Sequence, residues 1–226
     1  AYTGIKARGD STIANSGTIA AYNTGIYLRA GGSITNAAGA VISAVRNNGL
    51  YLGYTAAATV DNAGTILAGS YNAGGDLVGG DSAIRLGGGG VVINETGGRI
   101  VSGGVFAIDG GYHPGTVDNF GTIIGGTTYG AGVSATGIAL FGGGTITNEA
   151  GGLIIGYAHA IATQGGSTDS VANFGTIIGG QGQDDSAIAM RNGGTLTNGA
   201  GASITGATAG VYLGQGGAVS NAATGT

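Results

Sequence analysis

Carboxylates and histidines are the side chains of this chain to consider first for catalysis, because glycoside hydrolysis needs paired carboxylates that converge on one groove. The 226 residues include two glutamates, Glu95 and Glu149, at equivalent corners of a sequence repeat. Two coils of a stacked repeat would place them about 10 Å apart, slightly beyond the spacing of an inverting pair. His113 and His159 have no serine or aspartate partner set by the sequence. We therefore predict no catalytic residues and no enzyme activity.

Acidic residues in two loops raise the question of a calcium site. Segment 179–185 begins like a nonapeptide calcium repeat, and its polar members are Gln181, Asp184 and Asp185. Ser186 stands where that repeat needs an aliphatic residue, and no second copy adjoins it, whereas such repeats bind calcium when stacked in tandem. Asp76 and Asp81 could supply oxygen ligands across neighbouring loops. We predict no cofactor and no metal ligand, with calcium as the minor alternative.

A second kind of chemistry is recognition by short exposed motifs. Arg8-Gly9-Asp10 is the integrin-recognition tripeptide, and its position predicts an exposed corner. Arg29 and Arg191 occupy equivalent positions without a following Gly-Asp. Arginine at this position is therefore explained by the repeat without any integrin binding. The tripeptide is therefore a candidate binding motif with a plain structural alternative.

An aromatic and basic patch is the other recognition candidate. Lys6, Tyr27, Tyr51 and Arg85 occupy the same outward position in successive repeats, so we expect them to form one column. Such a column suits stacking on sugars or on a partner surface. Tyrosine also favours strands and packs on its neighbours, which is the structural alternative.

These residues must be positioned by a repeat that returns nine times, an asparagine followed by glycine and an aliphatic residue at intervals of 21 to 32 residues. A period near 25 with a strand-like core predicts a solenoid. Its copies are anchored at Asn15, Asn36, Asn62, Asn94, Asn119, Asn148, Asn173, Asn198 and Asn221. We expect these asparagines to form a structural ladder in which each side chain bonds turn backbone and the asparagine of the next coil. The alternative is a turn residue that tolerates left-handed dihedrals.

Each copy contains three short segments in which apolar and small or polar residues alternate, the pattern of half-buried strands. We predict an all-β, right-handed parallel β-helix of about eight to nine coils with three strands per coil, spanning 1–226 as one unit. Three inward stacks follow. The first holds Ile13, Ile34, Val60, Val92, Val117, Ile146, Val171, Leu196 and Val219; the second Ile19, Val41, Ile66, Ile100, Ile123, Ile154, Ile177 and Ile204; the third Ile5, Ile26, Leu50, Ile84, Ile108, Ile138, Ile161, Ile188 and Val211.

Three insertions, at 67–82, 124–137 and 178–187, fall at one corner of alternate coils. We expect them to project from one edge of the rod about 10 Å apart. Insertions gathered on one face of a repeat protein are often its binding surface, although drift at a tolerant loop is the alternative. Their candidate binding residues are Tyr71, Asn72, Asp76, Asp81, Tyr129, Gln181, Asp184 and Asp185.

Composition excludes several classes of protein. With 54 glycines, 8% charged residues and 42% apolar residues, the chain is too hydrophobic for disorder and lacks the three-residue period of collagen. A net charge of −4 with seven basic residues argues against nucleic acid, which requires clustered Lys and Arg. No apolar run approaches the length of a transmembrane helix. The absence of cysteine fits a protein exported by bacteria.

The Asn-x-Gly-Thr-Ile phrases, the glycine-rich corners and the Ala-Ile third strands together resemble the passenger domain of a bacterial autotransporter. The resemblance implies a β-helix exposed at the bacterial surface after export through the outer membrane, with a membrane barrel domain in the full-length protein. Both ends of the sequence fall within a coil, so we expect a fragment of a longer passenger.

The sequence thus favours a non-catalytic adhesin or structural stalk that contacts a host surface protein, a glycan or a second cell through strand faces and alternate-coil loops. A carbohydrate-binding or carbohydrate-active β-helix, like a tailspike or a lyase, is the alternative. An ice-binding β-helix is a minor alternative, because Thr and Ser are frequent at the outward positions of the first strand, where Asp61, Val91, Ile93 and Asp118 interrupt them.

Overall fold

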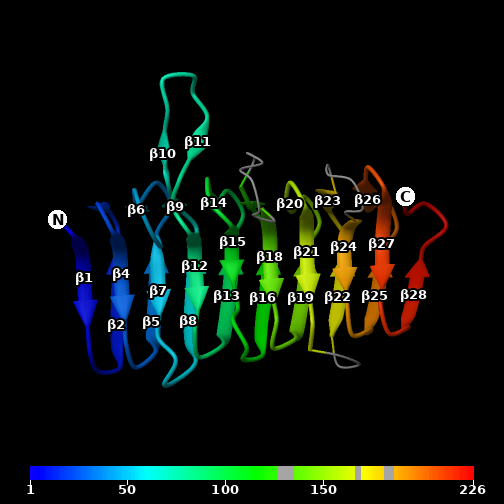
Figure 1. Cartoon of the computed structure of the whole chain (residues 1–226), viewed down its shortest axis with the longest axis horizontal. Coiled ribbons are helices and arrows are strands. Elements are labelled where there is room, and N and C mark those ends of the chain that lie inside the picture. Colours follow the sequence, from blue (N-terminus) through cyan, green and yellow to red (C-terminus); the bar gives the residue numbers. More distant parts are fainter. Residues whose placement is uncertain (127–134, 166–168, 181–185) are drawn as a thin grey trace.

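Short alternating strands coil the chain into a rod of three parallel sheets (Figure 1). The computed structural model describes residues 1–126, 135–165, 169–180 and 186–226, and within these ranges no residue is helical. None of the described segments could therefore cross a membrane as a long apolar helix. About eight coils stack along the axis, which confirms the predicted three-strand parallel β-helix.

The strands of each sheet come from successive coils. The first sheet contains β1 (Thr3–Ala7), β4 (Thr24–Leu28), β7 (Leu50–Leu52), β12 (Ser82–Leu86), β15 (Phe106–Asp109), β18 (Thr136–Leu140), β21 (His159–Thr163), β24 (Ser186–Met190) and β27 (Ala209–Leu213). The second contains β2 (Ser11–Asn15), β5 (Gly32–Asn36), β8 (Ala58–Asn62), β13 (Gly90–Asn94), β16 (Gly115–Asn119), β19 (Gly144–Asn148), β22 (Ser170–Asn173), β25 (Thr195–Asn198) and β28 (Ala218–Asn221). The third contains β3 (Thr18–Ala21), β6 (Val41–Ala44), β9 (Thr65–Ala68), β14 (Arg99–Ser102), β17 (Thr122–Ile124), β20 (Leu153–Ile155), β23 (Thr176–Gly179) and β26 (Ser203–Gly206).

The core is a column of aliphatic side chains between the sheets, and the first and third predicted stacks are confirmed residue by residue. The second stack was wrong at one position. Ile42, not Val41, pairs with Ile19 and Ile66 and is fully buried, whereas Val41 pairs with Thr18 and is half-buried. The long corner after Asn36 takes one more residue than we assumed, and a shift by one residue turns a strand side chain to the other face.

The nine asparagines are the last residues of the nine second-sheet strands and line one corner of the rod, where all except Asn221 are buried. The Nδ2 of each of the first eight donates to the Oδ1 of the asparagine in the next coil at 2.8 Å, which gives an unbroken series from Asn15 to Asn221. Each interior Nδ2 also lies within hydrogen-bonding distance of backbone carbonyls of its own or the following turn. The predicted ladder is confirmed, and it satisfies polar groups that the corner buries.

The first insertion forms an antiparallel hairpin, β10 (Ser70–Tyr71) with β11 (Leu77–Val78), that projects from the rod (Figure 1). It leaves the corner that joins the third sheet to the first, as the spacing predicted. The central parts of the other two insertions, 127–134 and 181–185, lie outside the described residues, so the expected row of three projections stays a prediction.

Candidate functional site

The predicted outward column on the first sheet is brought together as expected. Lys6 pairs in register with Tyr27, Tyr27 with Tyr51, and Tyr51 with Arg85. The Lys6 Nζ lies 5.5 Å from the centre of the Tyr27 ring, and the Tyr27 and Tyr51 ring centres are 5.1 Å apart at an interplanar angle of 38°. The column therefore presents two neighbouring aromatic rings, both half-exposed, with Lys6 at one end and Arg85 at the other.

Arg85 is held in place by groups on both sides. Its Nη1 donates to Asp109 Oδ2 at 2.7 Å, and its Nε and Nη2 donate to the Tyr54 hydroxyl at 3.2 and 3.0 Å. Asp109 is buried, and its Oδ1 accepts from the Gly111 backbone N–H at 2.8 Å. The guanidinium is thus fixed and its charge is balanced by Asp109.

Burial and neighbouring groups shift the acidities of this cluster. Burial raises the pKa of the Tyr51 phenol to about 12, and the adjacent Tyr54 adds to the rise. The pKa of Tyr54 is lowered, because Tyr51 and then the Arg85 guanidinium favour its phenolate against the opposing effect of burial. Burial also raises the pKa of Asp109, although the Gly111 N–H and Arg85 oppose that rise. With a pKa of about 12, the Tyr51 phenol is neutral at physiological pH and can donate a hydrogen bond.

Amides and a carboxylate form the facing side of the site. The Asn47 Nδ2 donates to Asn23 Oδ1 at 2.9 Å, and the Asn23 Nδ2 lies 3.5 Å from the Thr24 hydroxyl. Asn48 is buried, and its Nδ2 donates to Asp81 Oδ2 and to the Ser82 carbonyl, both at 3.4 Å. This second row of polar side chains runs along the rod, parallel to the aromatic column.

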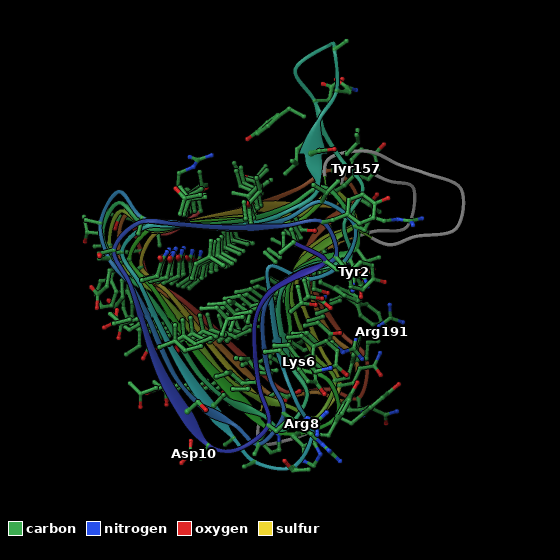
Figure 2. The ribbon with its side chains drawn as sticks, turned by 90° about the vertical axis from the view of Figure 1, so that its left-hand side faces the viewer. Tyr2, Lys6, Arg8, Asp10, Tyr157 and Arg191 are labelled. Atoms are coloured by element: carbon green, nitrogen blue, oxygen red, sulfur yellow. The ribbon has the colours of Figure 1, made fainter. Side chains whose placement is uncertain are left out.

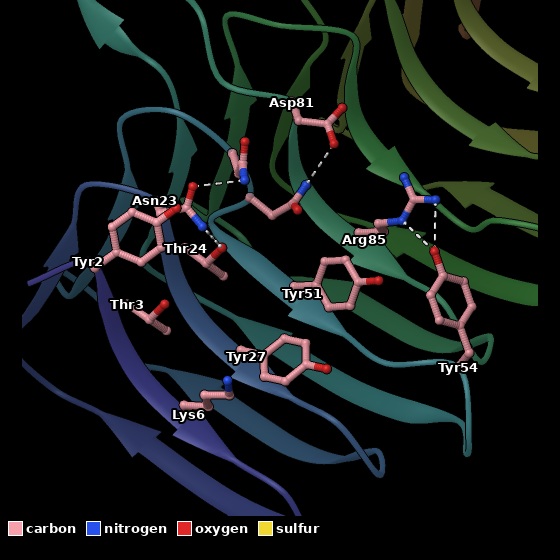
Figure 3. A pocket seen from close by; sticks show the side chains of 12 residues that line it. Tyr2, Thr3, Lys6, Asn23, Thr24, Tyr27, Tyr51, Tyr54, Asp81 and Arg85 are labelled. Atoms are coloured by element: carbon pink, nitrogen blue, oxygen red, sulfur yellow. Dashed lines mark hydrogen bonds between the residues drawn. The ribbon is translucent and has the colours of Figure 1, made fainter.

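The two rows enclose an open groove of about 540 Å³ on the outer face of β1, β4, β7 and β12. Figure 3 shows Asn23 and Asp81 on one side, and Tyr27, Tyr51 and Tyr54 on the other. Its lining consists of Tyr2, Thr3, Lys6, Asn23, Thr24, Tyr27, Asn47, Asn48, Tyr51, Tyr54, Asp81 and Arg85. We call this set the tyrosine groove.

The groove is built from one three-residue pattern repeated in four coils. Counted from the inward residue of each first-sheet strand, the lining residues stand three before it, two before it and one after it. The four sets are Tyr2, Thr3 and Lys6; Asn23, Thr24 and Tyr27; Asn47, Asn48 and Tyr51; and Asp81, Ser82 and Arg85, of which Ser82 alone does not line the groove. In the fifth coil the same positions hold Val105, Phe106 and Asp109, and Phe106 packs against Phe141 with ring centres 5.9 Å apart. The polar lining therefore ends at β15.

The predicted hairpin residues do not join the groove lining, with the exception of Asp81. Asn72 Oδ1 accepts from the backbone N–H groups of Gly74 and Asp76, and its Nδ2 donates to Asp76 Oδ2 at 3.3 Å. These bonds shape the tip of the hairpin, where Tyr71 is exposed. Asp76 and Asp81 thus have different partners, Asn72 and Asn48 respectively.

The Arg8-Gly9-Asp10 tripeptide lies in the turn between β1 and β2, and all three residues are exposed, as the sequence predicted. Figure 2 shows Arg8 and Asp10 at a corner of the rod, away from Tyr2. Its geometry suits contact with a partner, and its function stays a prediction.

The residues considered for catalysis are dispersed. Glu95 and Glu149 are half-buried at their corners, and each accepts a hydrogen bond from a turn glycine through its backbone carbonyl. His113 is exposed, whereas His159 is buried with its Nδ1 2.8 Å from the Ser186 carbonyl. Among the described residues, no three acidic or histidine side chains gather as metal ligands. Four candidates lie outside the described residues, namely Tyr129, Gln181, Asp184 and Asp185.

Sequence reasoning missed the amide side of the groove and the partners of Arg85. Asn23, Asn47 and Asp81 all stand three residues before an inward residue of the first sheet, so aligning the coils on that strand would have revealed their row. Tyr54 belongs to the turn after β7, and no periodic signal marks it.

Comparison with known proteins gives no match: no protein-family model, no curated protein and no solved structure is significantly similar to this chain. The geometry and chemistry of the site itself are therefore the basis for assigning a function.

Proposed function

We propose that this chain is a non-catalytic recognition segment of a bacterial surface adhesin, of the autotransporter passenger type, exposed outside the cell. Its task is contact with a host surface protein, a glycan or a second cell. One observation carries the proposal: the outer face of the first sheet presents an open groove with aromatic rings on one side and amides on the other.

The chemistry of the groove favours binding over catalysis. A general acid and a base need carboxylates on both sides of a scissile bond. The groove lining includes one carboxylate, Asp81, which accepts a hydrogen bond from Asn48, and Asp109 lies behind the lining, buried in its ion pair with Arg85. In the described part of the chain the lining thus holds a single carboxylate and not the pair that this chemistry needs. Aromatic and amide side chains, in contrast, are common in recognition surfaces.

The scaffold also suits a surface role. Its stability comes from neighbour-on-neighbour stacking, so loops and outward side chains are free to vary without loss of the core. The exposed Arg8-Gly9-Asp10 turn and the β10–β11 hairpin are further contact surfaces that this architecture supports.

Adhesion of cells that display the chain tests the proposal. We expect bacteria displaying it to aggregate or to bind host cell surfaces more than bacteria displaying the empty carrier. A variant without residues 70–79 tests the hairpin, because the flanking Gly69 and Gly80 lie side by side and can be joined with little change to the rod. Unchanged adhesion in that variant removes the hairpin from the proposal and leaves the groove as the contact surface.

The non-catalytic assignment has a separate test. Purified chain is incubated with polysaccharides of several linkages, and new reducing ends are measured. Release of reducing ends would contradict the non-catalytic assignment and favour the carbohydrate-active alternative. In the adhesion assay, adhesion no greater than that of bacteria displaying the empty carrier would refute the adhesin proposal.

A further inference from the structure

We infer that the tyrosine groove binds a neutral, linear oligosaccharide that lies along the rod axis, across the four coils of β1, β4, β7 and β12. This inference deepens the proposed function by naming the class of ligand that the adhesin recognises.

The groove runs along the rod, and its lining repeats from coil to coil. Three coils contribute the same three positions to the lining and the fourth contributes two of them, so lining side chains recur at the strand spacing of about 4.8 Å. The three intervals between four strands span about 14 Å. A groove that repeats along one direction matches a ligand that also repeats along one direction, and it ends where Phe106 replaces the polar residue.

Aromatic rings lie on one side of the groove and polar groups on the other. Tyr27 and Tyr51 present half-exposed ring faces, whose negative potential attracts the C–H bonds on the apolar face of a sugar ring. Opposite them, Asn47 and Asp81 offer amide and carboxylate groups that can donate to and accept from hydroxyls. A sugar ring has the same division, with an apolar face and hydroxyl groups around its edge.

Several polar atoms of the groove lining keep hydrogen-bonding capacity that the protein does not use. Within the described residues, Asn47 Oδ1, Asp81 Oδ1 and the Tyr27 hydroxyl have no protein hydrogen-bond partner. Asp81 Oδ2 and Asn23 Oδ1 each hold one protein donor, which fixes the side chains before a ligand arrives. Fixed side chains with free acceptors lower the entropy cost of binding.

The charges in and beside the groove lining balance one another. Lys6 and Asp81 carry opposite charges in the lining, and Arg85 is neutralised by Asp109. The groove therefore has no net field that would favour a uronate-rich or sulfated chain over a neutral one. Nucleic acid is disfavoured for the same reason.

An extended peptide fits the groove less well. Peptides that bind to sheets add a strand to a free edge and gain affinity from backbone hydrogen bonds. Here β4, β7 and β12 are paired on both sides, so their backbone groups are already used and only their side chains face the ligand. β1 pairs with β4 alone, and its other edge lies at the end of the sheet and not along the groove.

The inference is tested with the purified chain and a panel of linear hexose oligosaccharides, α- and β-linked, of two, four and six units, beside oligogalacturonates of the same lengths. Binding is measured by calorimetry and by NMR chemical-shift changes. We expect saturable binding of a neutral oligosaccharide, tighter for four units than for two, and insensitive to added salt. No binding of any neutral oligosaccharide, or tighter binding of an oligogalacturonate or of an extended peptide, would overturn the inference.

Three variants locate the site. We expect Tyr51→Ala to weaken binding about tenfold, because it removes one stacking ring. Asn47→Ala, at an exposed position that the fold tolerates, is expected to weaken binding about fivefold through a lost hydrogen bond. Tyr212→Ala is the matched control, because Tyr212 occupies the same strand position in β27, lines a different hollow and is expected to leave binding unchanged. Loss of binding in the Tyr212 variant with retention in the Tyr51 and Asn47 variants would move the site away from the groove.

Failure of the inference and failure of the adhesin proposal give different results. If the purified chain binds no sugar while displaying cells still adhere, the groove assignment is wrong and the adhesin proposal stands. If the chain binds a neutral oligosaccharide through Tyr51 but displaying cells do not adhere, the groove assignment stands and the adhesin proposal is wrong. Circular dichroism and urea midpoints of each variant confirm that the fold is retained.

Discussion

Replacing Asn119 with alanine measures how much the asparagine ladder stabilises the fold. Asn119 is fully buried in the middle of the rod. Its Nδ2 donates to Asn148 Oδ1 at 2.8 Å and to the Gly121 carbonyl at 3.2 Å, and its Oδ1 accepts from Asn94 Nδ2 at 2.8 Å. The substitution removes all of these bonds and leaves the neighbouring asparagines in place.

The magnitude follows from which groups lose their partners. Asn94 Nδ2 retains the Gly98 and Thr122 carbonyls at 3.2 and 3.3 Å, so its loss is partial. Asn148 Oδ1 loses the donor that the ladder gives it, in a buried site that water does not reach. A net hydrogen bond contributes about 1 kcal/mol, and a buried acceptor without a donor costs about 1–3 kcal/mol. We therefore expect the free energy of unfolding to fall by about 2–4 kcal/mol.

Urea unfolding followed by circular dichroism measures this change, and hydrogen exchange of β16 and β19 shows whether the loss is local. Two controls match the substitution. Thr116→Ala changes an outward residue of the same strand, and Asn221→Ala changes the exposed last member of the ladder. Each is expected to cost about 0.5 kcal/mol. An Asn119 variant no less stable than these controls would refute the assigned role of the ladder.

Three further predictions concern single residues. Gly144→Ala is expected to lower the free energy of unfolding in urea by about 2–3 kcal/mol, because Gly144 has φ of 142° and an added Cβ would overlap the Gly115 carbonyl. Gly97→Ala is its control and should cost about 1 kcal/mol, because Gly97 has φ of 83° but open space around the added Cβ. Burial raises the pKa of Asp109 above 3.8, so the folded state holds the carboxyl proton more tightly than the unfolded state does. The free energy of unfolding should therefore fall as pH rises from 3.8 through the raised pKa, and Asp109→Asn should flatten this part of the stability–pH profile. Tyr51, with a pKa of about 12 against the usual 10.0, should ionise at a higher pH than Tyr54, whose pKa is lowered, in an ultraviolet difference titration. Stability should fall between pH 10.0 and about 12, and Tyr51→Phe should remove that fall.

The fold could be predicted because every coil repeats the same information. Ile66, Ile100 and Ile123 each follow a corner asparagine and glycine in an alternating segment, and the structure stacks them in that order. The one error, Val41 for Ile42, arose where two adjacent aliphatic residues both fit the alternation. Only the length of the turn decides between them, and turn length is set by backbone geometry that alternation does not encode.

The groove could be predicted only in part. Tyr27, Tyr51 and Arg85 lie within strands, where the period of two assigns each side chain to a face. Asn23, Asn47 and Asp81 lie just before their strands, where alternation is absent. Tyr54 reaches Arg85 from a turn, and Asp109 reaches it from the next coil, so their contacts depend on how the coils stack. The closure of the groove at Phe106 likewise depends on a ring supplied by Phe141 from another turn.

The asparagine ladder has a direction that the strands alone do not require. Every Nδ2 points toward the C-terminal coil and every Oδ1 toward the N-terminal coil. The side-chain amide dipoles therefore add along the rod, as peptide dipoles add along a helix, and each polarises the next. Turning one interior amide by half a turn would set two NH₂ groups against each other at one junction and two oxygens at the other. The orientation is thus a collective property of the whole column, and the rod has an electrical polarity with its positive end at the C-terminal coil.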